Sequence, residues 1–207
     1  MQQKDEYGKP KEKGQRTSKY VYDPQGREKE HDVLDGKGEL VVRYKVQYRE
    51  DGEVKERVIY SKDGRVSVRM EYAYDSQKRL IATTTYNPDD KIIKKVTSEF
   101  DSQGNKIKEE VKEFVGKYGT DIVYYWAYIN GRKARETKTT LNNEKERRYS
   151  SEFDEWGNII KQVEPSGTVI NTVYTFDQYK NWVTATSSWK GSDGMVRYKK
   201  VREIQYY

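Results

Sequence analysis

His31 is the single histidine in the 207-residue chain, and the chain has no cysteine. The lack of cysteine excludes disulfides, thiolate metal sites and cysteine nucleophiles. A Ser-His-Asp triad would depend on His31 alone, in a charged turn region. We therefore predict a solvated His31, and neither catalytic residues nor a metal site nor a cofactor.

Carboxylates recur through the chain at one per turn, at Asp23, Asp75, Asp101, Asp154 and Asp177. Calcium needs several oxygens that converge on one point, and this spacing does not supply them. Asp in a turn accepts hydrogen bonds from nearby backbone N–H groups, so turn capping is the predicted role.

A pair of carboxylates in a cleft would be needed for glycoside chemistry. Glutamate is abundant on the polar faces of the predicted strands, which favours surface decoration over catalysis. The sequence therefore predicts a protein that is not an enzyme. The candidates for such a pair are Glu109, Glu110, Glu113 and Glu152 with Asp154.

Aromatic side chains are the most informative candidates for binding. Strand alternation places Tyr124, Trp126 and Tyr128 on one face and Tyr125 on the other. Most aromatics are predicted to fill the core of the sheet. Tyr125, Trp156 in a turn, and Trp189 are the predicted surface aromatics, which could stack on a sugar ring or anchor a protein partner.

Basic residues surround a predicted turn at Asn142–Asn143, with Glu136, Glu144 and Glu146 interleaved. The net charge of +6 is a modest basic excess, so specific nucleic-acid binding is not implied. A mixed surface that protects a sheet edge is favoured over a polyanion groove. The candidate basic patch comprises Arg132, Arg135, Arg147 and Arg148.

A repeated motif, aromatic-Asp-x-x-Gly-(Arg/Asn), organises the chain, and each copy predicts a strand end, a tight turn and the next strand. Anchor aromatics return at intervals that alternate around about thirteen residues, which is typical of a repeat protein. Lys78 and Lys180 stand where the motif expects Gly. The clearest copies lie at residues 20–27, 72–80, 98–107, 151–160 and 174–182.

No stretch shows helical periodicity, so the sequence predicts an all-β antiparallel meander of about fourteen strands built from repeated β-hairpins. Strands with one apolar and one charged face would expose the apolar face if the sheet were flat. We predict a strongly coiled single sheet or a barrel-like shape. The predicted domains are a flexible N-terminal leader at 1–18 and a repeat domain at 19–207.

These copies resemble the YD repeats of the RHS (rearrangement hotspot) type. The C-terminal run from Tyr174 to Tyr207 resembles the ending of small exported bacterial YD-repeat-like proteins of unknown function. The resemblance implies strips of antiparallel hairpins that coil into a shell, and the YD motif is also associated with carbohydrate binding. The chain has no room for the toxin domain that large family members enclose.

The sequence and the resemblance together predict a non-enzymatic binding or scaffold module of the bacterial cell envelope or exterior. The expected partner is a glycan or a protein, and no apolar run is long enough for a transmembrane helix. The N-terminus is polar, so the expected localisation, secreted, periplasmic or at the cell surface, presumes a signal peptide already removed. The alternatives are a structural shell segment and, third, a glycan-active enzyme.

Overall fold

The computed structural model describes residues 15–114, 119–142 and 145–205, and every regular element in these ranges is a β-strand. Within these ranges there is no helix that is long and apolar enough to cross a membrane. The strands are β1 (Thr17–Tyr22), β2 (Glu28–Leu34), β3 (Leu40–Tyr48), β4 (Val54–Ser61), β5 (Val66–Tyr74), β6 (Leu80–Tyr86), β7 (Ile92–Phe100), β8 (Lys106–Glu113), β9 (Thr120–Ile129), β10 (Arg132–Asn142), β11 (Lys145–Phe153), β12 (Ile159–Val163), β13 (Val169–Phe176), β14 (Trp182–Gly191) and β15 (Gly194–Val201).

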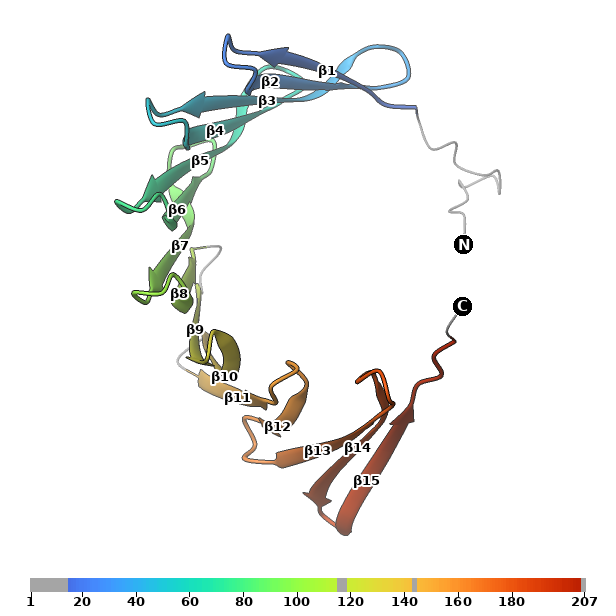
Figure 1. Ribbon diagram of the computed structural model, residues 1–207. Coiled ribbons are helices and arrows are strands. Elements are labelled where there is room, and N and C mark those ends of the chain that lie inside the picture. The colour runs from blue at the N-terminus through green and yellow to red at the C-terminus, as the bar shows by residue number, and fades with distance from the viewer. Residues whose placement is uncertain (1–14, 115–118, 143–144, 206–207) are drawn as a thin grey trace, which may run out of the picture. The chain divides into compact units, whose positions relative to one another are not determined.

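The sheet is a meander, because its strand order follows the chain from β1 to β15 and successive strands run antiparallel (Figure 1). The predicted all-β antiparallel meander is confirmed, with fifteen strands in place of about fourteen. β1 takes in the last two residues of the predicted leader, whereas residues 1–14 lie outside the described ranges. The predicted turn at 142–143 also falls partly outside them.

One turn geometry recurs between the strands, and Asp101 illustrates it. The Asp101 Oδ1 atom accepts hydrogen bonds from the backbone N–H groups of Gln103 and Asn105, at 2.9 and 2.8 Å. Gly104 has a φ of 86°, which places it in the left-handed region that closes a three-residue hairpin loop with a bulge. The predicted role of the repeated Asp in capping turns is confirmed. The same arrangement is found at Asp23, Asp35, Asp75, Asn87, Asp154 and Asp177.

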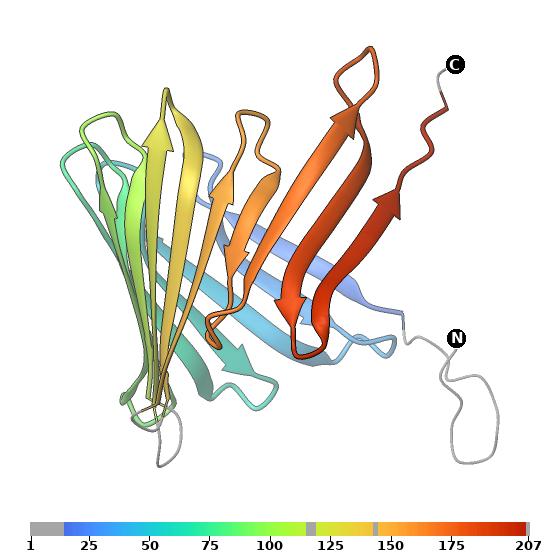
Figure 2. The ribbon, with the colours of Figure 1, turned by 90° about the horizontal axis from the view of Figure 1, so that it is seen from below.

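The chain divides into two compact units, residues 1–94 and 95–207. In the first unit, the turns at 23–27, 49–53 and 75–79 lie on one edge of the meander, because two strands separate each from the next. In the second unit, every other turn again shares an edge, and β9 to β12 lie side by side in both views (Figures 1 and 2). The turns on this edge are those after β7, β9, β11 and β13.

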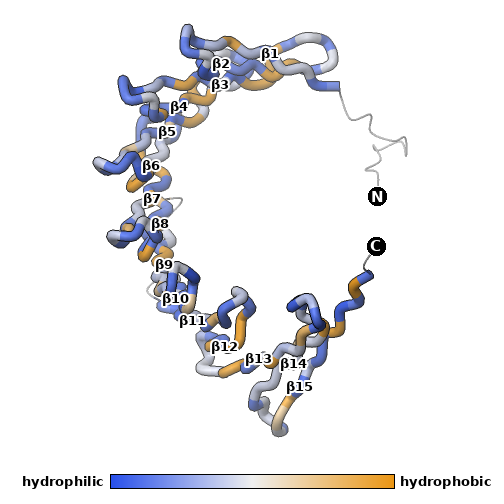
Figure 3. Tube along the Cα trace, viewed as in Figure 1, coloured by the Kyte–Doolittle hydropathy of each residue, from blue (hydrophilic) through white to orange (hydrophobic). Residues whose placement is uncertain are grey.

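Each unit is a single layer in which polar and apolar residues alternate along the strands (Figure 3). The buried hydrophobic residues among those described are Leu34, Val46, Val58, Val111 and Ala185. The prediction that most aromatics fill a buried core is therefore wrong. Instead, neighbours on the same face cover them, and cations lie over their rings. In the first unit these pairs are Arg27 with Tyr48 at 4.3 Å, Lys45 with Tyr60 at 5.7 Å, Arg49 with Tyr74 at 5.8 Å and Arg69 with Tyr86 at 3.8 Å.

His31 is not the solvated side chain that the sequence predicts. It lies directly opposite Tyr20 on β1 and Tyr44 on β3, and its ring stacks on theirs with centroids 4.3 and 5.4 Å apart. Its Nε2 atom is buried without a hydrogen-bond partner. The strand register therefore gives His31 a packing role in the first unit.

Candidate functional site

The β11–β12 turn presents Trp156 to solvent. Asp154 Oδ1 accepts the N–H groups of Trp156 and Asn158, at 3.0 and 2.8 Å, and Asp154 Oδ2 accepts the Asn158 side-chain amide at 2.9 Å. Gly157, with a φ of 84°, completes the loop. The indole at the loop tip is 52% exposed, in a turn that its neighbours hold closed.

An aromatic cluster supports Trp156 from the β13–β14 hairpin. The rings of Trp156 and Phe176 lie 4.9 Å apart, and Phe176 contacts Tyr174 at 6.4 Å. Tyr174 packs edge-on against Trp182 at 6.2 Å and donates a hydrogen bond to the Ile159 carbonyl at 3.2 Å. One part of the Trp156 ring is therefore fixed against the protein, and the exposed part is available to a ligand.

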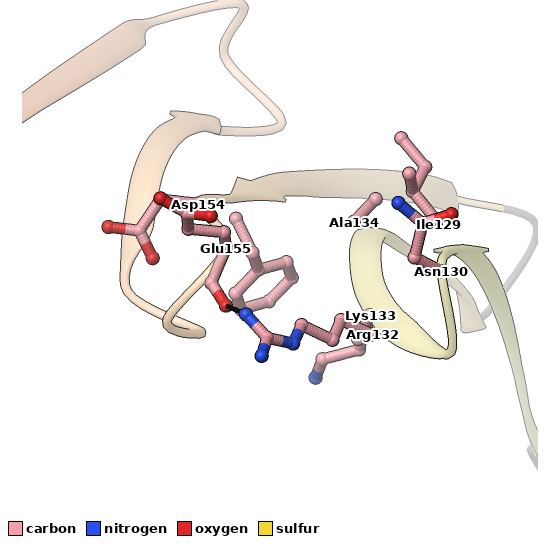
Figure 4. Close-up of a pocket in the computed structure, with 8 residues that line it drawn as sticks. Ile129, Asn130, Arg132, Lys133, Ala134, Asp154 and Glu155 are labelled. Carbon is pink, nitrogen blue, oxygen red and sulfur yellow. Dashed lines mark hydrogen bonds between the residues drawn. The ribbon is translucent and has the colours of Figure 1, made fainter.

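The β9–β10 turn supplies the basic side of the site. Asn130 and Gly131 have positive φ values of 52° and 74°, as a two-residue hairpin turn requires. Arg132 follows directly, and its guanidinium donates a 2.6 Å hydrogen bond to the Glu155 backbone carbonyl (Figure 4). This bond joins the β9–β10 turn to the β11–β12 turn on the same edge.

Lys133 lies beside Arg132 with its ammonium 4.4 Å from the centre of the Phe153 ring. The same ammonium is 3.0 Å from Glu136 Oε2, which also accepts a hydrogen bond from the Trp126 indole N–H at 2.8 Å. Burial raises the pKa of Glu136, but these two hydrogen bonds, together with the positive charges of Lys133 and Lys138, bring the pKa below its usual value. Glu136 is therefore a charged anchor for Lys133.

Two adjoining hollows lie between these turns. The first encloses about 470 Å³ and the second about 510 Å³, and they share Arg132, Lys133, Phe153 and Glu155. We call the two together the turn-edge cleft. Its remaining lining residues are Ile129, Asn130, Ala134, Asp154, Trp156 and Gly157.

The sequence-predicted basic patch is only partly assembled. Arg132 lines the cleft, and Arg135 pairs with Glu152 at 2.9 Å. Arg147 and Arg148 are exposed on β11, where they lie opposite Thr140 and Thr139 of β10. These two threonines are five and four residues along β10 from Arg135. That separation is about 13–17 Å along the strand, so these two arginines do not join the cleft.

The three predicted surface aromatics lie in different places. Trp156 lines the cleft, whereas Tyr125 is 47% exposed in the middle of β9, opposite Thr137. Trp189 is half-buried on β14 opposite Val196. Phe153, Glu155 and Ile129 also line the cleft and were not predicted as site residues. A usable signal was present, because alternate turns of a meander share an edge and bring these residues together.

The described acidic side chains with a displaced pKa are all displaced downward, at Asp23, Asp32, Asp35, Asp63, Asp75, Asp101, Glu136 and Glu152. Hydrogen bonds from Lys161 and Arg135 lower the pKa of Glu152. A general acid in glycoside hydrolysis needs a raised pKa, which Glu152 does not have. In the described ranges, no three His, Asp or Glu side chains are grouped to hold a metal ion.

No family model matches the chain, and no curated protein matches it. Among solved structures, it is similar to a porin-like protein from Bacteroides uniformis, with 12% identity over 91% of this chain and 89% of that one, and a TM-score of 0.40. It is also similar to the Photorhabdus luminescens Tc holotoxin pore (17% identity, 89% of this chain, 9% of that chain, TM-score 0.34).

A further similar structure is TcdB2-TccC3 without its hypervariable C-terminal region (10% identity, 91% of this chain, 15% of that chain, TM-score 0.32). The chain thus spans less than one sixth of these toxin chains. The likeness to all three structures is weak and carries no conclusion about activity. The resemblance to YD repeats therefore depends on the motifs of this chain.

Proposed function

We propose that this protein is a non-enzymatic binding module of the bacterial cell envelope or exterior, and that it recognises a glycan through the turn-edge cleft. The observation that carries the proposal is the position of Trp156, which is half exposed at a cleft that also contains Arg132 and Lys133. An aromatic plane beside fixed hydrogen-bond donors is suited to a sugar ring and its hydroxyl or carboxylate groups.

The site is preorganised on both sides. Phe176 supports the indole, and the bond from Arg132 to the Glu155 carbonyl holds the two turns together. The lysine at position 133 is held between Glu136 and the Phe153 ring. A ligand therefore meets groups whose rotamers are already restricted, which reduces the entropy cost of binding.

The test is a titration of the 207-residue chain with a panel of bacterial and host polysaccharides. Binding is measured by tryptophan fluorescence and by calorimetry. For a polysaccharide that binds, Trp156→Ala and Arg132→Ala are expected to weaken affinity by about tenfold or more, which is on the order of 1.4 kcal/mol. Tyr125→Ala is the matched control, since it removes an exposed aromatic outside the cleft, and its affinity should stay within about twofold.

Binding that is lost equally in the Tyr125 and Trp156 variants would contradict the assignment of the cleft. Absence of binding to every polysaccharide would contradict the glycan function itself. The second candidate, a structural shell segment, is favoured by the sparse burial within each single-layer unit, which leaves side chains to be covered by other molecules. It predicts no glycan affinity and no sensitivity to Trp156.

A further inference from the structure

The outer edge of β1 is an open strand edge with a single charged residue. In the described part of the chain, β1 has β2 as its single strand neighbour, and all six of its residues are exposed. Tyr20, Val21 and Tyr22 are 46, 52 and 58% exposed. Lys19 is the one charged residue in β1, and the strand contains no proline.

The turn after β1 shows which backbone groups face outward. The Asp23 N–H donates to the Arg27 carbonyl, and the Asp23 carbonyl accepts from the Gly26 N–H, so both Asp23 groups point toward β2. Antiparallel strands alternate in this respect, so Val21 and Lys19 also bond to β2. The N–H and C=O groups of Ser18, Tyr20 and Tyr22 therefore point to the open side.

The aromatic spacing agrees with this assignment. Tyr20 and His31 are direct cross-strand partners, and their rings stack at 4.3 Å. The next pair along the row, His31 and Tyr44, lies at 5.4 Å. Side chains are closer in pairs that do not exchange backbone hydrogen bonds, as expected if the Tyr20 backbone groups face away from β2.

The other end of the strand order differs from β1 in charge. β15 is also exposed along its whole length, but it carries Arg197, Lys199 and Lys200 within eight residues. Charged residues of this kind protect an edge strand against pairing with another chain. β15, with three cations, is therefore the better protected edge, and β1, with Lys19 alone, is the less protected one.

We propose that β1 pairs with β1 of a second copy of this chain, antiparallel about a two-fold axis at Tyr20. In this register, Tyr20 faces Tyr20 of the partner, and Ser18 faces Tyr22, so the outward groups form about six backbone hydrogen bonds. Lys19 stands opposite Val21, and no like charges face one another. The two Tyr20 rings would continue the stacks on His31 from both copies.

The first experiment measures mass in solution for the 207-residue chain by analytical ultracentrifugation over about 1 to 200 µM. A dimer of twice the 24.5 kDa chain mass is expected to form with rising concentration. A monomer throughout this range would overturn the proposal, as would a larger open-ended series of oligomers.

A charge substitution tests whether β1 forms the interface. Val21→Lys would place a second lysine opposite Lys19 of the partner, twice per dimer, whereas within one copy position 21 faces Glu30. The dimer dissociation constant is expected to rise by about tenfold or more, because like charges directly opposite are unfavourable. Val201→Lys, the matched control on β15, should leave it within about twofold; the reverse result would overturn the proposal.

Crosslinking tests the register, because the chain has no natural cysteine. Directly opposed residues that exchange hydrogen bonds lie about 5.5 Å apart between Cα atoms, within disulfide range. Tyr20→Cys is therefore expected to give a disulfide-linked dimer under oxidation. Tyr22→Cys is the control: the two positions 22 are offset by about 13 Å along the strands, so equal crosslinking of both variants would exclude this register.

Discussion

The phenol of Tyr48, at the end of β3, donates a 2.8 Å hydrogen bond to the backbone carbonyl of Glu28, the first residue of β2. The same relationship recurs in the second unit, from Tyr128 to the Lys106 carbonyl and from Tyr174 to the Ile159 carbonyl. In each case the accepting residue lies five positions after the Asp that opens the preceding turn on that edge. A tyrosine thus joins each of these hairpins to the one before it.

Tyr48→Phe removes this hydrogen bond and keeps the ring. The Glu28 carbonyl then has to find water instead, so we expect the free energy of unfolding to fall by about 1 kcal/mol. Urea denaturation monitored by circular dichroism measures the change. Tyr125→Phe, at an exposed position of β9, is the matched control and should change the free energy by less than about 0.5 kcal/mol. If Tyr48→Phe changed the free energy of unfolding no more than the control does, the hydrogen bond from Tyr48 to Glu28 would contribute nothing to stability.

Acid should destabilise the protein through its Asp turns. Hydrogen bonds from Asn105 lower the pKa of Asp101. In the same way, the backbone N–H of Arg79 lowers the pKa of Asp75, and the backbone N–H of Glu39 lowers the pKa of Asp35. Each pKa lies below its usual 3.8, so these carboxylates stabilise the fold above about pH 4 and lose that contribution as the pH falls through their folded-state values.

The measurement is the melting temperature between about pH 7 and pH 2.5. The melting temperature should fall most steeply below about pH 4, and Asp101→Asn with Asp75→Asn should flatten that fall, because Asn does not titrate. Asn87 already fills this position in the chain, and its Oδ1 accepts the N–H groups of Asp89 and Lys91. An unchanged acid slope in the double variant would contradict this account.

Lys180 holds a left-handed conformation, with a φ of 64°, at the position that Gly occupies in other turns. A side chain in this region is strained, so Lys180→Gly is expected to raise the free energy of unfolding by about 0.5–1 kcal/mol. Lys78, with a φ of 61°, should gain less on the same change, because its ammonium donates a 2.8 Å bond to the Asp51 carbonyl. Thermal denaturation compares the two; a larger gain at position 78 would contradict the argument.

Trp156→Ala should lower the free energy of unfolding by only about 1 kcal/mol, because half of this side chain is already in water. Tyr174→Ala removes a ring that contacts both Phe176 and Trp182 and also the bond to Ile159, so a loss of about 3 kcal/mol is expected. Denaturant titration separates the two values. A loss at Trp156 as large as that at Tyr174 would mean that the exposed indole is mainly structural.

The sequence predicted the strands and turns well because their signals are local. Alternation along Val42–Tyr48 and the Asp-x-x-Gly turns are each read within a few residues, and the Lys at positions 78 and 180 was found in the Gly role from the same pattern. The strand count differed by one from about fourteen. His31 could not be placed, because its partners Tyr20 and Tyr44 follow only from the register of three strands.

The site was harder to predict because it depends on which turns are neighbours. Arg132 and Arg147 are close in sequence but separate along β10 and β11, whereas Arg132 and Glu155 are 23 residues apart and in contact. Proximity in the sequence therefore placed four arginines in one predicted basic patch, whereas the strand register keeps two of them away from the cleft. Trp156 could be singled out because a turn position alone indicates exposure, but its neighbours Phe153 and Lys133 required the edge assignment.

The alternation of turns between two edges has a consequence for how such a chain can change in length. Duplication or deletion of one hairpin, about 26 residues from Tyr22 to Tyr48 or from Tyr48 to Tyr74, leaves every remaining turn on its own edge and every tyrosine donor beside an acceptor. Duplication of a single strand would transfer all later turns to the opposite edge. We therefore expect the chain to gain or lose whole hairpins and not single strands. The turn-edge cleft can then persist while the number of strands varies.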